Sequence, residues 1–161
     1  MDKELAVQSL TDTMAKFTAY IGKRLPKDVK SKLIELKTLE TNPLAKSIYD
    51  SMDENQEAAD RLNRPSCQDT GVIQYFVEAG AHFPLLGELQ EILREATEEA
   101  TRTGPLRHNA VETFDEKNTG TNTGTQIPWL DWRIVPEQDT CTIDVYMAGG
   151  GCTLPGAAKV L

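Results

Sequence analysis

The chain has 161 residues, of which 39 % are apolar and 26 % are charged, so it is long enough to bury a core and too apolar for a disordered protein. Seventeen basic and 25 acidic side chains give a net charge of −8, which argues against nucleic acid or an anionic membrane as the main partner. No apolar run approaches the roughly 18 residues of a transmembrane helix, and the N-terminus lacks a signal-peptide pattern. The three cysteines are odd in number and widely spaced, so we expect reduced thiols in a cytoplasmic protein.

The first 63 residues have the pattern of helices. Apolar side chains at helical spacing form three stripes: Leu10, Met14, Phe17 and Ile21; Val29, Leu33 and Leu36; and Leu44, Ile48, Met52, Ala59 and Leu62. Pro26 stands where a helix can begin, and Asn42-Pro43 is typical of an N-cap followed by proline at the first helical position. We interpret the three stripes as surfaces that pack between helices.

After Asn63 the pattern changes. Residues 71–77 are rich in β-branched and aromatic side chains and predict a strand, as do 132–135 and 142–147. Residues 84–102 predict a helix, which presents Leu85, Leu89, Ile92 and Ala96 on one face and glutamates on the other, whereas 115–126 is polar and predicts a loop. We therefore expect an α+β fold in a single domain, 1–161. A helical region, 1–63, would precede a mixed α/β unit, 64–161, with a small sheet.

Cysteine positions divide into two kinds. Cys67 lies in RPSCQDTG (64–71), where the flanking proline and glycine predict a tight turn that could bring the thiol to a cleft. The alternative is an incidental surface or half-buried cysteine. Cys141, by contrast, shares a strand face with Ile143, Val145 and Met147, which is typical of a small buried hydrophobic residue.

Other residues suit the binding of an anion. The glycines at 149–151, followed by Cys152, can present successive N–H groups to a carboxylate, although a flexible turn explains them as well. Arg107 can pair with a carboxylate in bidentate fashion and His108 could act as a base; an ordinary surface arginine and a satisfied histidine are the alternatives. His82 has apolar neighbours and we expect a structural role for it. A zinc site made from these cysteines and histidines has no support from ligand spacing.

Four segments resemble one known family in the same order. RPSCQDTG (64–71), LRHNAV (106–111), KNTGTNTG (117–124) and GGGCTLPG (149–156) are similar to motifs of the iron–sulfur class I fumarase and tartrate dehydratase family. The resemblance implies a hydro-lyase with a [4Fe–4S] cluster, in which three cysteines leave one iron open as a Lewis acid. Such an enzyme dehydrates a small dicarboxylate, L-tartrate to oxaloacetate or malate to fumarate. Cys152-Thr153-Leu154 stands where the fumarases typically have Ser-Glu-Asn, which favours tartrate.

The resemblance also implies roles for individual residues. Cys67 matches the first cluster ligand, Gln68 and Asp69 match positions that touch the bound acid, and Asp69 would assist proton transfer. Arg107 would clamp a substrate carboxylate, and the backbone at Gly150 would approach the substrate.

The family implies a partner and a longer chain. Its α-subunits pair with a β-subunit, and their second and third cluster cysteines lie beyond the position matching residue 161, in motifs that contain neither Cys141 nor Cys152. We therefore expect a fragment that is inactive alone. A non-catalytic module that binds a dicarboxylate or a protein partner is the alternative.

Overall fold

The computed structural model describes residues 2–104, 106–112 and 114–150, and confirms an α+β fold in which helices precede a sheet-containing region. The elements in chain order are α1 (Lys3–Ile21), α2 (Lys27–Leu39), α3 (Pro43–Arg61), β1 (Val72–Gly80), α4 (Leu89–Thr103), β2 (Trp129–Val135) and β3 (Cys141–Ala148). The strands form one sheet in the order β2-β1-β3, with β2 parallel and β3 antiparallel to β1. No helix in the described ranges is long and apolar enough to cross a membrane.

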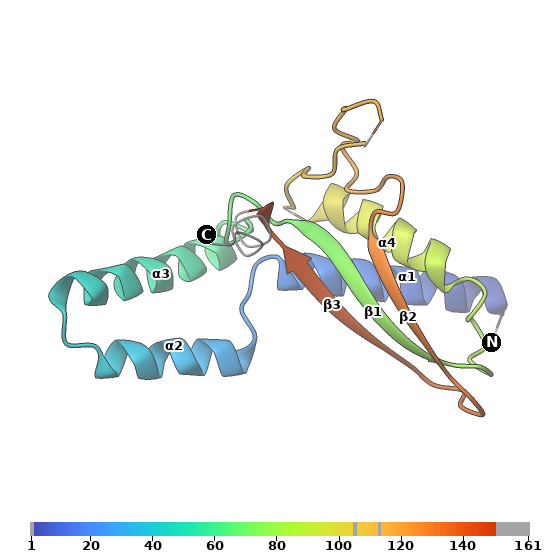
Figure 1. Cartoon of the computed structure of the whole chain (residues 1–161), viewed down its shortest axis with the longest axis horizontal. Helices are drawn as coiled ribbons and strands as arrows, with labels where there is room; N and C mark the ends of the chain where they lie inside the picture. Colours follow the sequence, from blue (N-terminus) through green and yellow to red (C-terminus); the bar gives the residue numbers. More distant parts are fainter. Residues whose placement is uncertain (1, 105, 113, 151–161) are drawn as a thin grey trace, which may run out of the picture.

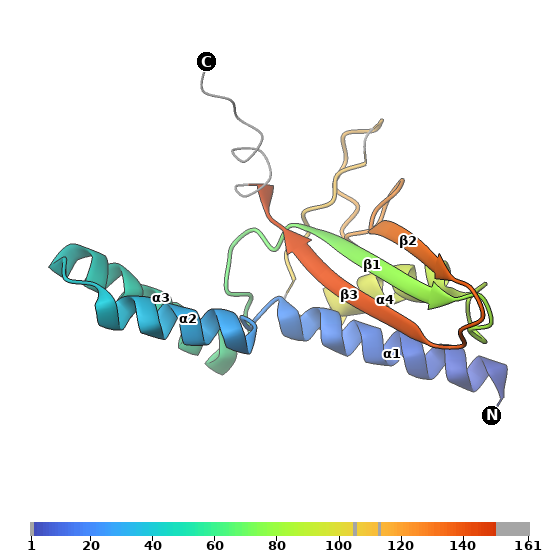
Figure 2. The ribbon, with the colours of Figure 1, turned by 60° about the horizontal axis from the view of Figure 1, so that its bottom comes forward.

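The sheet and two helices make two layers. Figures 1 and 2 show α1 and α4 lying side by side along the same face of the sheet, with α4 connecting the parallel strands β1 and β2. Alternate side chains of β1, among them Ile73, Tyr75 and Val77, point into this layer and are buried, whereas Phe76 on the opposite face is 41 % exposed. The core therefore lies between the sheet and the helix pair.

Polar hydroxyls complete this core. The buried hydroxyl of Tyr75 shares hydrogen bonds with Thr18 Oγ1 on α1 at 3.0 Å and with Thr97 Oγ1 on α4 at 3.1 Å. Thr11 and Thr18 belong to the buried face of α1, together with Met14 and Ala15. The prediction that Phe17 packs in the core was wrong, because threonines take that face and leave Phe17 44 % exposed.

The Tyr75→Phe variant is expected to lose about 1–3 kcal/mol of unfolding free energy, because both threonine hydroxyls lose a buried partner. Burial raises the pKa of Tyr75 above 10.0, so the folded state keeps a proton that the unfolded state releases as the pH rises. The wild-type protein should therefore lose stability above about pH 10, and the variant should lose less. Urea denaturation at pH 7 and above pH 10 measures both effects; equal stability of the two proteins at pH 7 would contradict the first.

Helices α2 and α3 form a hairpin that projects from the two-layer body (Figure 1). The N-cap at Asn42 is confirmed, since its side chain accepts a hydrogen bond from Leu44 N at 2.9 Å. The interpretation of both apolar stripes as packed surfaces was wrong: α2 has no buried residue, Ala59 is the buried residue of α3, and Leu44 is 70 % exposed. Helical spacing shows that a face is apolar, but most side chains of these two stripes stay exposed.

The boundaries of the later elements differ from the predicted ones. The helix expected over 84–102 begins at Leu89, because residues 83–88 form successive turns around Pro84 and Gly87 instead of a helical first turn. Its predicted buried face is confirmed at Leu89, Ile92 and Ala96. The strands extend beyond the predicted runs, to 72–80, 129–135 and 141–148, because pairing in the sheet continues past the most apolar residues.

Strand direction brings three connections to one end of the sheet. Val72 at the start of β1 pairs with Ala148 at the end of β3, and Gln74 pairs with Trp129 at the start of β2. The segment before β1, the segment before β2 and the residues after β3 therefore meet at this end, which we call the loop end of the sheet (Figure 1). The described residues of all four segments of the family resemblance, which for the fourth are Gly149 and Gly150, lie in these connections.

Candidate functional site

The segment 64–71 is anchored on both sides of its cysteine. Ser66 N donates to Gly22 O at 3.2 Å, and Ser66 O accepts from Asn55 Nδ2 at 2.7 Å. Gly71 adopts a φ of +79°, and a Cβ there would lie 2.1 Å from the Ala148 carbonyl carbon, so the turn requires glycine. Between these anchors, the side chains of Cys67 and Gln68 are exposed, as expected for a turn that presents a thiol.

Asp69 joins three segments of the loop end through its side chain. Its Oδ1 accepts from Gly71 N at 2.9 Å and from Asn109 Nδ2 at 2.7 Å. Its Oδ2 accepts from Gly150 N at 2.7 Å. The carboxylate therefore holds together the loop before β1, the loop after α4 and the glycines after β3, which is a structural role that the sequence did not indicate.

Arg107 lies in the second of these loops. Its backbone N–H donates to Thr70 Oγ1 at 3.1 Å, which places it beside the segment of Cys67 and Asp69. The side chain is exposed, and no ion pair or hydrogen bond of its guanidinium is found within the described ranges. An arginine in this position can take a carboxylate from solution without breaking an internal ion pair.

Gly150 is the third predicted contact at the loop end. Its N–H, which we expected to face a substrate, donates to Asp69, and a Cβ on Gly150 would lie 3.3 Å from Asp69 Oδ2. The third glycine of the predicted N–H nest at 149–151, Gly151, lies outside the described residues, as does Cys152. Four of the predicted site residues, Cys67, Gln68, Asp69 and Gly150, thus lie on two segments that the Asp69 carboxylate connects, and Arg107 lies on the third.

The other cysteine and the histidines lie elsewhere or face solvent. Cys141 begins β3 at the end opposite to the loop end, roughly 23 Å along the strand from Ala148. It packs against the core as predicted, and burial raises the pKa of its thiol, which disfavours the thiolate that binds metals. His82 follows β1 at the same far end, and the His108 side chain is exposed.

The described residues therefore offer a single thiol to a metal centre at the loop end, and they contain no group of three or more metal-binding side chains. One thiolate does not hold a [4Fe–4S] cluster, which takes three or four ligands. Cys67 fits as one ligand of a cluster, and these residues do not fit as its complete set.

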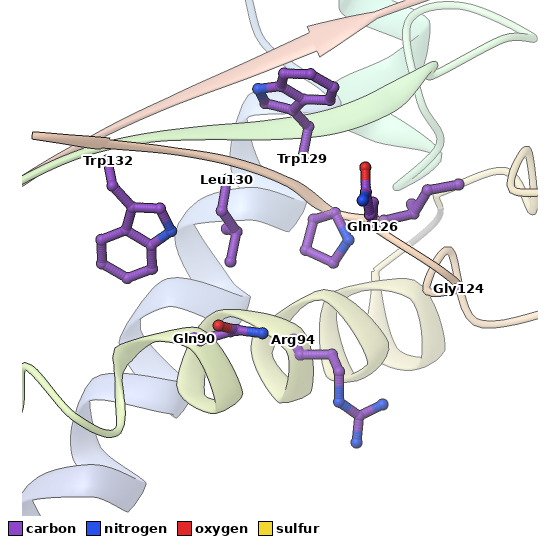
Figure 3. A pocket seen from close by; sticks show the side chains of 9 residues that line it. Gln90, Arg94, Gly124, Gln126, Trp129, Leu130 and Trp132 are labelled. Atoms are coloured by element: carbon purple, nitrogen blue, oxygen red, sulfur yellow. The ribbon is translucent and has the colours of Figure 1, made fainter.

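Two hollows lie beside the body of the molecule. Figure 3 shows the smaller, of about 310 Å³, between α4 and the edge strand β2, with Leu130 and Trp132 facing Gln90. Its arginine, Arg94, already pairs with Glu91 at 2.8 Å and is therefore not a free anion site. The larger hollow, of about 750 Å³, lies between the end of α1 and the α2–α3 hairpin. Neither is lined by a predicted site residue.

Sequence comparison decides the family. A family model described as fumarate hydratase (Fumerase) matches residues 11–161. The chain belongs to the fumarate hydratase family. Within this family it is similar to the L(+)-tartrate dehydratase subunit alpha of Escherichia coli strain K12 and of Shigella boydii serotype 4, each 58 % identical over 99 % of this chain, and to that of Escherichia coli O157:H7, 59 % identical over the same share. Each match covers 53 % of the relative, so the chain spans about half the length of these family members.

The sequence did not single out two asparagines that hold the candidate site of this fumarate hydratase family member together. Asn109 binds Asp69 directly, and Asn122 binds the backbone of the loop that carries Arg107. Both lie in segments that carry the family resemblance, LRHNAV and KNTGTNTG, which was the available signal. Their partners lie 12–40 residues away in the chain, so spacing could not reveal them.

Proposed function

We propose that this chain forms part of a cytoplasmic iron–sulfur hydro-lyase that dehydrates L(+)-tartrate to oxaloacetate and water, acting as the counterpart of an α-subunit together with a β-subunit. The observation that carries the proposal is the meeting of Cys67, Asp69 and Arg107 on joined loops, in a chain 58 % identical to a protein named L(+)-tartrate dehydratase subunit alpha. Because the chain spans about half of that relative, the proposed activity belongs to a larger assembly and we expect this chain to be inactive alone.

The side chains at the loop end suit a dicarboxylate. In the proposal, the exposed Arg107 guanidinium binds one substrate carboxylate through paired N–H donors, and the exposed Gln68 amide contacts the bound acid. The backbone at Gly150 approaches the substrate beside the Asp69 carboxylate. A positive group is required here because the net charge of the chain is −8, which repels an anionic substrate at long range.

Dehydration removes a proton from one carbon and hydroxide from its neighbour, and the resulting enol of oxaloacetate becomes the ketone. In the proposal Asp69, which the resemblance places against the bound acid, takes part in the proton transfer; three N–H donors hold its half-buried carboxylate at a fixed position. Cys67 supplies one thiolate to a [4Fe–4S] cluster, and the other ligands come from outside the described residues.

Two alternative functions remain distinct from this one. A class I fumarate hydratase would use the same loops on malate, and the family model that matches the chain carries that description. A non-catalytic module would bind a dicarboxylate through Arg107 without chemistry; in its favour, Cys67 is the single thiol that the described residues place at the loop end. Assays of the assembled enzyme with L-tartrate and with malate separate the first two; absence of both activities would favour the third.

The Arg107→Ala variant of the assembled enzyme tests the binding role. It should weaken substrate binding by about 1.5–3 kcal/mol, because a charge-assisted hydrogen bond to the carboxylate is lost. Steady-state kinetics measures the change as a rise in KM of roughly 10- to 150-fold. Arg102→Ala is the matched control, because Arg102 is also exposed near the end of α4 but pairs with Glu99 at 2.6 Å. Unchanged KM and kcat for Arg107→Ala would disprove the role.

A further inference from the structure

Asn122 is buried within the otherwise polar loop before β2. Its side chain is 3 % exposed and its φ is +59°, a left-handed conformation that asparagine tolerates better than most residues. All four hydrogen-bonding positions of its amide are occupied. Oδ1 accepts two N–H groups and Nδ2 donates to two oxygens, so the side chain has a complete set of partners in the fold.

The partners of Asn122 belong to the loop that carries Arg107. Oδ1 accepts from Asn109 N at 2.8 Å and from Ala110 N at 3.2 Å, and Nδ2 donates to Arg107 O at 2.7 Å. The fourth bond, from Nδ2 to Thr101 Oγ1 at 3.2 Å, ties the loop to the buried face of α4. The Asn122 side chain thus fixes the backbone of 107–110 against α4, one of the two helices that pack on the sheet.

The same loop reaches the carboxylate of the site. Asn109, whose N–H is held by Asn122, donates its own Nδ2 to Asp69 Oδ1 at 2.7 Å. Asp69 in turn accepts from Gly150 N through its other oxygen. A continuous series of hydrogen bonds therefore connects α4, Asn122, Asn109, Asp69 and Gly150.

We propose that Asn122 is a positioning residue, which sets the place of Arg107 directly and that of the Asp69 carboxylate through Asn109. The importance of Asn122 for catalysis rests on the proposed function. The hydrogen-bonded connection from Asn122 to Gly150 is independent of that function. Asn122 itself is buried behind the loop, so it acts on substrate only through residues that reach the loop surface.

Asn122→Asp is the sharpest variant. It keeps the size of the side chain and its acceptor oxygen for the two N–H groups, but it replaces both donated hydrogen bonds by an oxygen facing Arg107 O and Thr101 Oγ1. Asn63→Asp is the matched control, because Asn63 also has a positive φ, of 49°, yet is exposed and accepts a bond from Lys23, so it takes no part in the series from α4 to Gly150.

Amide hydrogen exchange on the 161-residue chain tests the connection without cofactor or partner. In Asn122→Asp, the new oxygen repels Arg107 O and pushes the loop away from α4. The N–H groups of Asn109, Ala110 and Gly150 should therefore exchange about tenfold faster, whereas those of Tyr75 and Val77 in β1 stay protected. Unchanged exchange at Gly150 would overturn the proposal, and so would equal acceleration in β1, which would indicate general destabilisation.

A second variant tests the step between Asn122 and Asp69, and it keeps the proposal testable if Asn122→Asp does not fold. Asn109→Ala removes the bond to Asp69 but leaves the N–H of Ala110 on Asn122. We expect faster exchange at Gly150 with little change at Ala110. The reverse pattern would show that Asn109 does not transmit the position of the loop to Asp69, and it would overturn the proposal.

Kinetics of the assembled enzyme test the catalytic consequence separately. Asn122→Asp should lower kcat/KM for L-tartrate about 100-fold at unchanged iron content, because Arg107 and Asp69 are displaced while Cys67 is not. Wild-type kcat/KM in this variant would overturn the catalytic part of the proposal. If the wild-type assembly itself has no activity, the proposed function fails, and the exchange experiment still decides the positioning role.

Discussion

The Cys67→Ser variant of the assembled enzyme is expected to contain no [4Fe–4S] cluster and to have no dehydratase activity. Cys67 is an exposed thiol in the anchored segment before β1, and the described residues place no second thiol at the loop end of the sheet. A serine hydroxyl is a poor replacement for thiolate at iron, and a cluster with one open iron has no spare ligand to compensate. Anaerobic measurement of iron and acid-labile sulfide gives the result directly.

Cys141→Ser is the matched control for this experiment. Cys141 lies at the opposite end of β3 and packs against the core, so its replacement should cost some stability and leave iron and sulfide at the wild-type level. Full iron in Cys67→Ser would refute its role as a ligand. Iron lost from Cys141→Ser at unchanged folding would show that our interpretation of Cys141 is wrong. The same analysis on the 161-residue chain alone is expected to find no cluster.

The Gly71→Ala variant should show the largest loss of stability among the glycines before and around the site. Gly71 has a φ of +79°, and an added Cβ would lie 2.1 Å from backbone of Ala148, which no side-chain rotation can relieve. The left-handed conformation alone costs about 1–2 kcal/mol for a residue with a Cβ, and the clash adds to it. We expect a loss of about 3 kcal/mol or more in unfolding free energy, measured by urea denaturation.

Variants of two other glycines separate the cost of the left-handed conformation from the cost of the clash. Gly120 also has a positive φ, of +74°, but a Cβ added there would meet no atom within 4 Å, so Gly120→Ala should lose only about 1–2 kcal/mol. Gly87 has neither a positive φ nor a close neighbour, and Gly87→Ala should be neutral or slightly stabilising. Equal stability of the three variants would contradict the view that the close contact between Gly71 and the end of β3 fixes the turn.

The helix and strand faces that pack in the two-layer body followed from periodicity. The face of α4 that contains Leu89, Ile92 and Ala96 was predicted, and so was the face of β3 that contains Cys141. Periodicity succeeds there because one face of each element meets the core. It fails on α2 and α3, where most side chains of the apolar stripes stay exposed, and on α1, where the buried face includes threonines, which an apolar pattern does not contain.

The candidate site was predictable as a set of residue types and not as an arrangement. Cys67, Gln68 and Asp69 are neighbours in the chain, so their proximity is trivial, whereas Arg107 and Gly150 come from segments that only the sheet brings near them. The engagement of Asp69 by Asn109 could not be predicted, because it depends on how two loops of irregular backbone face each other. The resemblance named the segments, and the hydrogen bonds show how they fit together.

The way Asp69 connects its partners has a consequence for the order of folding. Its bonds to Asn109 and Gly150 close chain segments of 40 and 81 residues, far longer than the contacts within the helices. Pairing of β1 with β3 joins Val72 to Ala148 and already closes a segment of similar length, so we expect the bonds of Asp69 to form once the sheet has brought their partners together. We therefore expect the loop end to assemble after the sheet, and residues that hold it should affect the unfolding rate more than the folding rate.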